Sequence, residues 1–177
     1  MHNLQSFVDK LNQLATNFQK KFNKAQQLSL DDMIKLLEET KLVICRQNDF
    51  VITTDPSGTR TIETIGGDQW LFVSQNLMIN TDQALQLAKN GDCYMHIHLA
   101  TKAVGSNNNS ISGNIKLDNS TSQFSFGVKA GENIDINLPL TNIKNSDDFR
   151  VAIHNLSGFW QYDSSSSYIE VIEGSPA

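Results

Sequence analysis

Cysteine and proline are both scarce in this chain of 177 residues, which contains two cysteines and three prolines. Two cysteines, Cys45 and Cys93, are too few for the disulfide framework that stabilises many small secreted proteins. We therefore expect both to be small buried apolar residues in strands. A chain of this length has room for one ordinary domain and an appendage. The core of such a domain is large enough to fold without disulfide bonds or a structural metal ion.

Positive charge is also in short supply. The chain has 14 Lys and Arg against 19 Asp and Glu, a formal net charge of -5, and charged residues make up only 19% of it. The basic residues of the first 41 positions are mixed with acidic ones, and the C-terminal half is net acidic. Because nucleic acids are bound through a face that neutralises phosphates, we expect no nucleic-acid partner.

Long apolar runs are missing from the sequence as well. No stretch approaches the roughly 20 apolar residues of a membrane-spanning helix. Residues 1–5 (MHNLQ) lack the charged and then apolar pattern of a signal peptide. We therefore expect no membrane partner and synthesis as a soluble chain in a reducing compartment.

What the sequence does have begins with a helical period in its first 41 residues. An apolar stripe at steps of three and four typical of a/d positions is formed by Leu4, Phe7, Leu11, Leu14 and Phe18. A second helix is expected from the capping residue Ser29 to about Thr40. Helices this short are marginal alone, so two arrangements stay open. Both helices fold back on the rest of the chain, or the first one pairs with copies of itself in an oligomer.

From residue 42 the pattern changes to short β-type runs separated by turn residues. The expected strands are 42–45, 50–54, 59–65, 70–73, 77–79, 93–101, 114–117, 123–128, 133–138, 149–154 and 168–172. Residues 81–89 fit either a helical turn or a strand, and 104–112 read as a polar loop. This spacing predicts an α+β content: a helical segment over 1–41, and an antiparallel, jelly-roll-like β-sandwich over 42–177.

Three local sequences in the C-terminal half resemble the jelly-roll heads of the tumour-necrosis-factor and complement-head type. Residues 91–97 (GDCYMHI) are similar to the entry into an alternating strand, 128–134 (VKAGENI) to a turn between two late strands, and 167–172 (SYIEVI) to the closing strand. The resemblance covers about 70–173. The sequence departs from the family in two respects. Residues 156–159 (LSGF) match the usual Phe-Ser-Gly segment only in part, and the expected stalk is helical instead of collagen-like.

The resemblance implies a homotrimer that presents a jelly-roll head. Proteins of this plan occur often as bacteriophage appendages, and a chain rich in Asn, Ser and Gln without a signal peptide suits one. We therefore expect a non-enzymatic structural protein of a virion, such as a fibre, receptor-binding or baseplate-type part, with other virion proteins docked on its N-terminal helices. The alternatives are a monomeric carbohydrate-binding module and a purely architectural capsid or collar decoration protein.

His96 and His98 are the most suggestive pair for metal chemistry. Residues two apart in a strand share a face, so both imidazoles project together with Tyr94. Two imidazoles on one side are typical metal ligands. No Glu follows within 99–105, so within one chain the pair is short of ligands and we expect no cofactor. Three such strands that meet on a trimer axis would supply six nitrogens.

Aromatic residues suggest a second kind of site. Residues 159–163 (FWQYD), followed by four serines, are expected to form an exposed loop. Aromatic faces bind the C–H surfaces of sugars, so the candidates to stack on a host-surface glycan are Trp70, Tyr94, Trp160 and Tyr162, of which Trp160, Tyr162 and Tyr94 are preferred. The alternative for Trp160 is that it anchors the core or a subunit interface. Trp70, which is flanked by Leu71 and Phe72, is expected in the core. No nucleophile elbow, Walker loop or metalloprotease motif is present, so we expect no enzyme.

Overall fold

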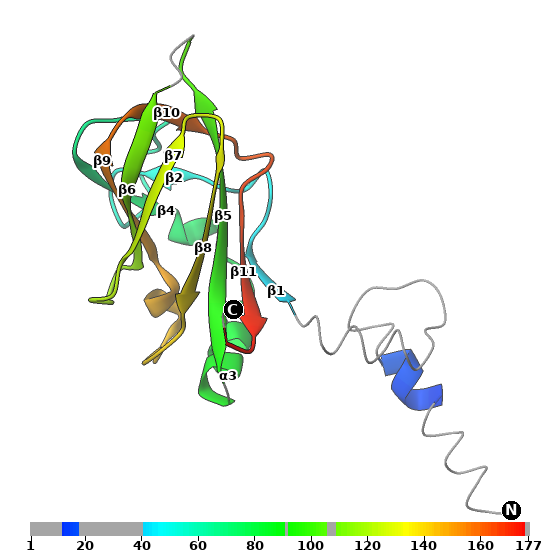
Figure 1. Ribbon diagram of the computed structural model, residues 1–177. Helices are drawn as coiled ribbons and strands as arrows, with labels where there is room; N and C mark the ends of the chain where they lie inside the picture. Colours follow the sequence, from blue (N-terminus) through cyan, green and yellow to red (C-terminus); the bar gives the residue numbers. More distant parts are fainter. Residues whose placement is uncertain (1–11, 18–40, 91, 106–108, 176–177) are drawn as a thin grey trace, which may run out of the picture. The chain divides into compact units, whose positions relative to one another are not determined.

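The computed structural model describes residues 12–17, 41–90, 92–105 and 109–175 (Figure 1). The chain divides into two compact units, Met1–Thr40 and Lys41–Ala177. In the first unit, residues 12–17 form a helix. The second predicted helix, from Ser29 to Thr40, lies outside the described residues, and so do four members of the predicted apolar stripe, Leu4, Phe7, Leu11 and Phe18.

The second unit is a sandwich of two antiparallel sheets, as predicted (Figure 1). The order in the first sheet is β1 (Lys41–Cys45), β11 (Tyr168–Glu173), β5 (Cys93–Ala103), β10 (Phe159–Tyr162) and β3 (Thr64–Gly66), and β8 (Asn133–Pro139) pairs with β5. The order in the second sheet is β2 (Ile52–Thr53), β4 (Gln69–Val73), β9 (Val151–Ser157), β6 (Ser110–Leu117) and β7 (Phe124–Lys129). We refer to them as the six-stranded and the five-stranded sheet.

Three short helical segments connect these strands: η1 (Gln75–Leu77), α3 (Thr81–Asn90) and η2 (Ser146–Phe149). The helical alternative for 81–89 is therefore correct. The expected polar loop 104–112 is wrong at its end, because residues 110–112 already belong to β6. Three expected strands are wrong or much shorter than expected. Residues 77–79 form no strand, of 50–54 only Ile52–Thr53 form β2, and of 59–65 only the end enters β3, while Thr61 bridges Thr53.

The turn before β3 explains that shortening. The carboxylate of Asp55 accepts hydrogen bonds from the backbone N–H groups of Thr59 and Arg60, at 3.4 and 3.0 Å, and from the Ser57 hydroxyl. Backbone donors that are used in this way are not available for strand pairing. These bonds, led by the one from Ser57, lower the pKa of Asp55 to about 2.

The core lies between the sheets and is filled by the inward positions of alternating strands. In β5 every second side chain from Cys93 to Leu99 is buried, while Tyr94, His96 and His98 point outward and are half-buried. Cys45 and Cys93 are free thiols in buried positions, as expected, and burial raises the pKa of Cys45 to about 12. The largest fully buried side chain is that of Trp160.

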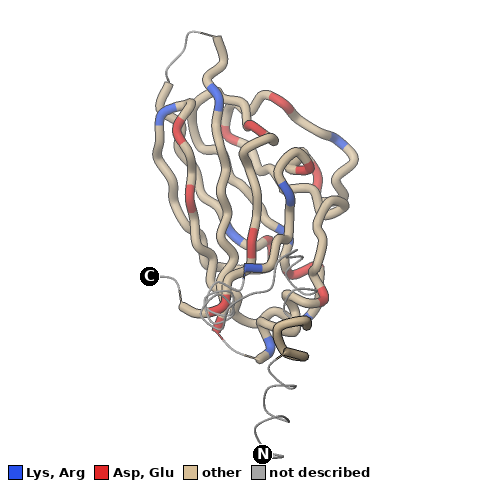
Figure 2. Tube along the Cα trace, turned by 90° about the vertical axis from the view of Figure 1, so that its right-hand side faces the viewer, with Lys and Arg blue, Asp and Glu red and all other residues tan. Residues whose placement is uncertain are grey.

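Charges are scattered over the outside of the sandwich. Figure 2 shows Lys and Arg separated by long uncharged stretches and interspersed with Asp and Glu on the side that faces the viewer. Among the described residues on that side, basic positions do not gather into a continuous stripe.

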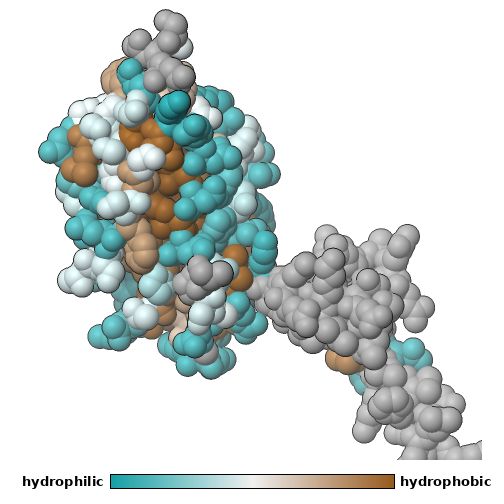
Figure 3. All heavy atoms as spheres, viewed as in Figure 1, coloured by the Kyte–Doolittle hydropathy of each residue, from teal (hydrophilic) through white to brown (hydrophobic). Residues whose placement is uncertain are grey.

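An apolar strip lies where the two sheets end beside each other. β7 is paired with β6 and β8 is paired with β5, and these two strands border the strip. The side chains of Phe124 and Val128 on β7 are only partly buried against the core. Figure 3 shows apolar residues gathered along this side of the sandwich. We call this the β7–β8 seam.

Candidate functional site

The outer face of the five-stranded sheet carries a row of polar and aromatic side chains. Trp70 of β4 lies opposite His154 of β9, which lies opposite Asn114 of β6, and Asn114 lies opposite Ser125 of β7. The Ser125 hydroxyl donates to the side-chain oxygen of Asn114 at 2.8 Å. Since cross-strand neighbours on one face are in contact, these four residues form one continuous surface.

Trp70 is the exposed aromatic residue of this surface. Its side chain is 42% exposed, and its ring stacks on the His154 imidazole with centroids 4.4 Å apart and planes 8° apart. The ammonium of Lys116 lies 5.1 Å from the centroid of the indole. The expectation that Trp70 belongs to the core is wrong. In the run 70–73 the inward positions are taken by Leu71 and Val73, which leaves Trp70 and Phe72 on the outer face.

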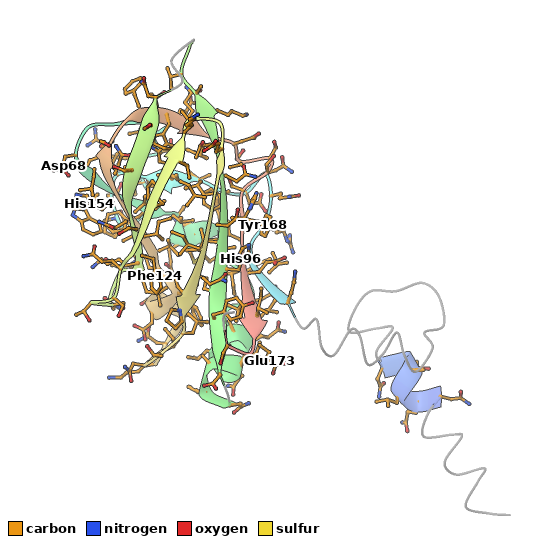
Figure 4. The ribbon with its side chains drawn as sticks, in the orientation of Figure 1. Asp68, His96, Phe124, His154, Tyr168 and Glu173 are labelled. Carbon is orange, nitrogen blue, oxygen red and sulfur yellow. The ribbon has the colours of Figure 1, made fainter. Side chains whose placement is uncertain are left out.

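Two further contacts hold this aromatic pair in place. A ring nitrogen of His154, Nε2, lies 2.7 Å from the Asp68 carboxylate, which comes from the turn between β3 and β4 (Figure 4). Lys116 donates to the carbonyl oxygens of Asp118 and Ser120 at 3.3 and 3.4 Å. We call Trp70, His154, Asp68, Lys116 and Asn114 the Trp70 platform. Sequence reasoning missed it, because its members come from three strands and a turn.

Trp160 does not lie on an exposed loop, so that prediction is wrong. Residues 159–162 form strand β10, paired with β3 and β5. The Trp160 side chain is 0% exposed, and its indole N–H donates to the side-chain oxygen of Asn155 at 2.9 Å. A buried indole satisfied inside the protein cannot stack on a sugar.

The other two predicted stacking residues are separated from each other. Tyr162 shares the inner face with Trp160, and its ring packs at 6.1 Å from that of buried Phe50. It also lines a shallow hollow of about 250 Å³ together with Glu63, Lys102, Gln161 and Ser164. Tyr94 lies near the start of β5, whereas Tyr162 pairs with Thr101 near its end. At about 3.3 Å per residue, roughly 23 Å of strand separates them.

The outer face of the six-stranded sheet holds the two predicted histidines. His96 and His98 project from β5 beside Asp135 and Asn137, which are their register partners in β8. His98 Nδ1 lies 2.6 Å from Asp135 Oδ1, and His96 Nε2 lies 3.6 Å from the same oxygen. The expectation that one chain lacks a third ligand is therefore wrong, since Asp135 supplies a carboxylate from another strand.

Tyr168 of β11 completes this surface on the other side of the histidines (Figure 4). Its ring stacks on that of His98 with centroids 4.9 Å apart and an angle of 19°. Beside it lies a wide hollow of about 550 Å³ that Tyr168 and Glu170 line together with residues of β1 and the turn after it. We call His96, His98 and Asp135 the His-His-Asp cluster.

For the predicted oligomerisation stripe, the structure describes one residue. Leu14 lies in the helix of residues 12–17 and its side chain is 44% exposed. The described residues contain no helix that is both long and apolar enough to cross a membrane. Comparison of the chain with protein-family models, with curated proteins and with solved structures found no match.

Proposed function

We propose that this protein is a non-enzymatic carbohydrate-binding protein, and that the Trp70 platform is its binding surface. The observation that carries the proposal is an exposed indole, fixed by stacking on His154 and surrounded by side chains that donate and accept hydrogen bonds. Binding faces of this kind are flat and need no deep pocket. This replaces Trp160 with Trp70 as the stacking residue and keeps glycan as the ligand class.

The chemistry of a sugar fits these groups. One face of a pyranose ring presents C–H groups, which an aromatic ring covers at a small cost in conformational entropy because the indole is already held. The ring edge presents hydroxyls, which both donate and accept. Asp68 and Asn114 supply acceptors, while Lys116 and the amide of Asn114 supply donors. All lie on or beside the same sheet face.

The strand order supports the proposal that the sandwich is a jelly roll. When the three shortest strands, β2, β3 and β10, are left aside, each sheet holds four strands. Their orders are β1-β11-β5-β8 and β4-β9-β6-β7, so strands from late in the chain lie between strands from early in it. Two interleaved four-stranded sheets are the arrangement of a jelly roll. This order is consistent with the resemblance between residues 70–173 and the trimeric heads.

As the setting we propose a trimeric bacteriophage appendage, in which the sandwich presents the platform and the N-terminal segment docks on other virion proteins. The β7–β8 seam supports self-association, because it is an exposed apolar strip that a second copy could cover. If it packs on a different face of the next copy, the contact is head-to-tail, and three copies form a ring when the rotation between neighbours is a third of a turn. Light scattering of the full chain tests the trimer. A mass of three 19.7 kDa chains is expected, and the mass of one chain would contradict it.

Binding to a microarray of bacterial surface polysaccharides tests the carbohydrate proposal. The full chain should bind a subset of glycans, and Trp70→Ala should lose that binding. Phe159→Ala is the matched control, because Phe159 is a similarly exposed aromatic residue (46%) on the six-stranded sheet. Equal binding by the wild type and Trp70→Ala would overturn the assigned surface. Absence of any glycan binding would favour a purely architectural decoration protein.

A further inference from the structure

We propose that the His-His-Asp cluster binds one divalent transition-metal ion of the Zn²⁺ type within a single chain. The ligands would be His96 Nε2, His98 Nδ1 and an Asp135 carboxylate oxygen, whose atoms all lie within 4.8 Å of one another. The proposal is independent of the carbohydrate proposal, because this cluster lies on the six-stranded sheet and the Trp70 platform lies on the other one.

The distances suit a shared ion. Zn²⁺ binds His nitrogen and carboxylate oxygen at about 2.0–2.2 Å, so ligand atoms around it are separated by roughly 3 to 3.5 Å. The two nitrogens lie 2.6 and 3.6 Å from the same Asp135 oxygen, on either side of that range. For all three atoms to surround one ion, side-chain rotation has to move the Asp135 oxygen away from His98 Nδ1 and toward His96 Nε2. An ion on His98 Nδ1 requires the tautomer with its proton on Nε2, so the proton that Nδ1 shares with Asp135 would pass through solvent to Nε2 when the ion binds.

A neighbouring amide orients one of the ligands. The Nδ1 of His96 lies 2.8 Å from the side-chain oxygen of Asn137, an acceptor, so this nitrogen carries the proton. His96 Nε2 is then left with its lone pair, and this is the nitrogen that faces Asp135. Metal-binding histidines ordinarily donate their second ring N–H to such an outer partner, which sets the tautomer and the ring orientation.

The scaffold holds the ligands close to their positions before an ion arrives. Residues 94–98 of β5 are hydrogen-bonded to β11 on one side and to β8 on the other. The stacked ring of Tyr168 restricts rotation of the His98 imidazole. Asp135 is 52% exposed, so the remaining coordination positions of the ion face solvent. Such a site accepts water or an oxygen ligand beside three protein ligands.

A second His-carboxylate pair in the same chain provides an internal control. His154 lies 2.7 Å from Asp68, much as His98 lies 2.6 Å from Asp135. Around His154 the structure places Trp70 and Lys116, an aromatic ring and a cation, where His96 stands in the His-His-Asp cluster. A lone histidine and carboxylate beside a cation form a hydrogen-bonded pair and do not make a metal site.

The experiment is calorimetric titration of Zn²⁺ into the full chain without a histidine tag, in buffer free of chelators, with Co²⁺ absorption as a second readout. We expect one ion per chain. His96→Ala and His98→Ala should each abolish it, and Asn137→Ala should weaken it by roughly 10- to 100-fold. His154→Gln should bind like the wild type. Circular dichroism shows that each variant is folded.

Two results would overturn the inference. One is Zn²⁺ binding that is absent from the wild type, or unchanged in the folded His96→Ala and His98→Ala variants. The other is one ion for every three chains, which would place the metal between copies of the protein instead of within one. A Co²⁺ d–d absorption band that is more intense than that of the free aqueous ion, as a coordination number below six gives, and that disappears in His98→Ala, would support it.

Discussion

Trp160 donates its indole hydrogen bond to Asn155 inside the sandwich, at 2.9 Å, and both side chains are completely buried. The amide group of Asn155 also donates to the carbonyl oxygen of Gly67 at 2.7 Å. Gly67 belongs to the turn that carries Asp68 into contact with His154. The buried tryptophan, which was expected on the surface, therefore supports the turn beside the exposed one.

Replacement of that buried amide should destabilise the protein. Asn155→Ala leaves the Trp160 N–H without its partner, and a buried unsatisfied donor costs about 1–3 kcal/mol. Urea denaturation followed by circular dichroism measures the change in the free energy of unfolding. Asn114→Ala is the control, since its side chain lies at the surface and its loss should cost less than about 0.5 kcal/mol. Equal losses in the two variants would contradict the assigned role of Asn155.

The two tryptophans should differ in fluorescence. Trp70 is 42% exposed and Trp160 is buried, so Trp70→Phe should leave a blue-shifted emission that acrylamide quenches poorly. Trp160→Phe should leave a red-shifted and readily quenched emission. Steady-state emission and quenching of the folded variants measure both properties. The opposite assignment of the two spectra would show that the faces of β4 and β10 are reversed.

A glycine in β6 allows this strand to approach β9 and the ring of Phe126 closely. A Cβ added at Gly113 would collide with the carbonyl oxygen of His154 and with the ring of Phe126. Gly113→Ala should therefore push β6 and β9 apart and lower the melting temperature by several degrees, since overpacking costs about 1–3 kcal/mol. Gly127→Ala in β7 is the matched control, because a Cβ there meets nothing within 4 Å. A neutral Gly113→Ala variant would contradict the close approach of the two strands.

Acid should remove the contribution of the Asp55 turn. Hydrogen bonds to its carboxylate lower the pKa of Asp55 from 3.8 to about 2. A lowered pKa means that the carboxylate stabilises the fold above its unfolded pKa, and that this contribution is lost as pH falls from 3.8 through about 2. The difference in urea midpoint between wild type and Asp55→Asn should shrink over that interval. A difference that stays constant over that interval would contradict the assigned role of the Asp55 carboxylate.

Local patterns in the sequence were sufficient where one face of a strand is clearly apolar. Strand β5 was expected at 93–101 and is Cys93–Ala103, with His96 and His98 on the outer face. The segment 133–138 was likewise close to β8, Asn133–Pro139. In both segments polar and apolar residues alternate, so the period of two determines which side chains are buried.

The same reasoning failed where both faces carry large apolar residues. The runs 70–73 (WLFV) and 159–162 (FWQY) carry large apolar residues at both alternate positions, so the pattern does not determine which ones are inward. Trp70 was expected in the core and is exposed, whereas Trp160 was preferred as a stacking residue and is buried. Asp135 was missed for another reason. Its position beside His98 depends on the register between β5 and β8, and that pairing brings together residues 37 positions apart in the chain.

The measurement that tests the account most directly is tryptophan emission during titration with the glycan that binds best on the microarray. Wild-type emission should shift to the blue and saturate, because a sugar that covers Trp70 removes water from the exposed indole. Trp70→Phe, which retains only the buried Trp160, should show neither the shift nor binding. A saturating blue shift that persists in Trp70→Phe would place the ligand elsewhere and contradict the proposed binding surface.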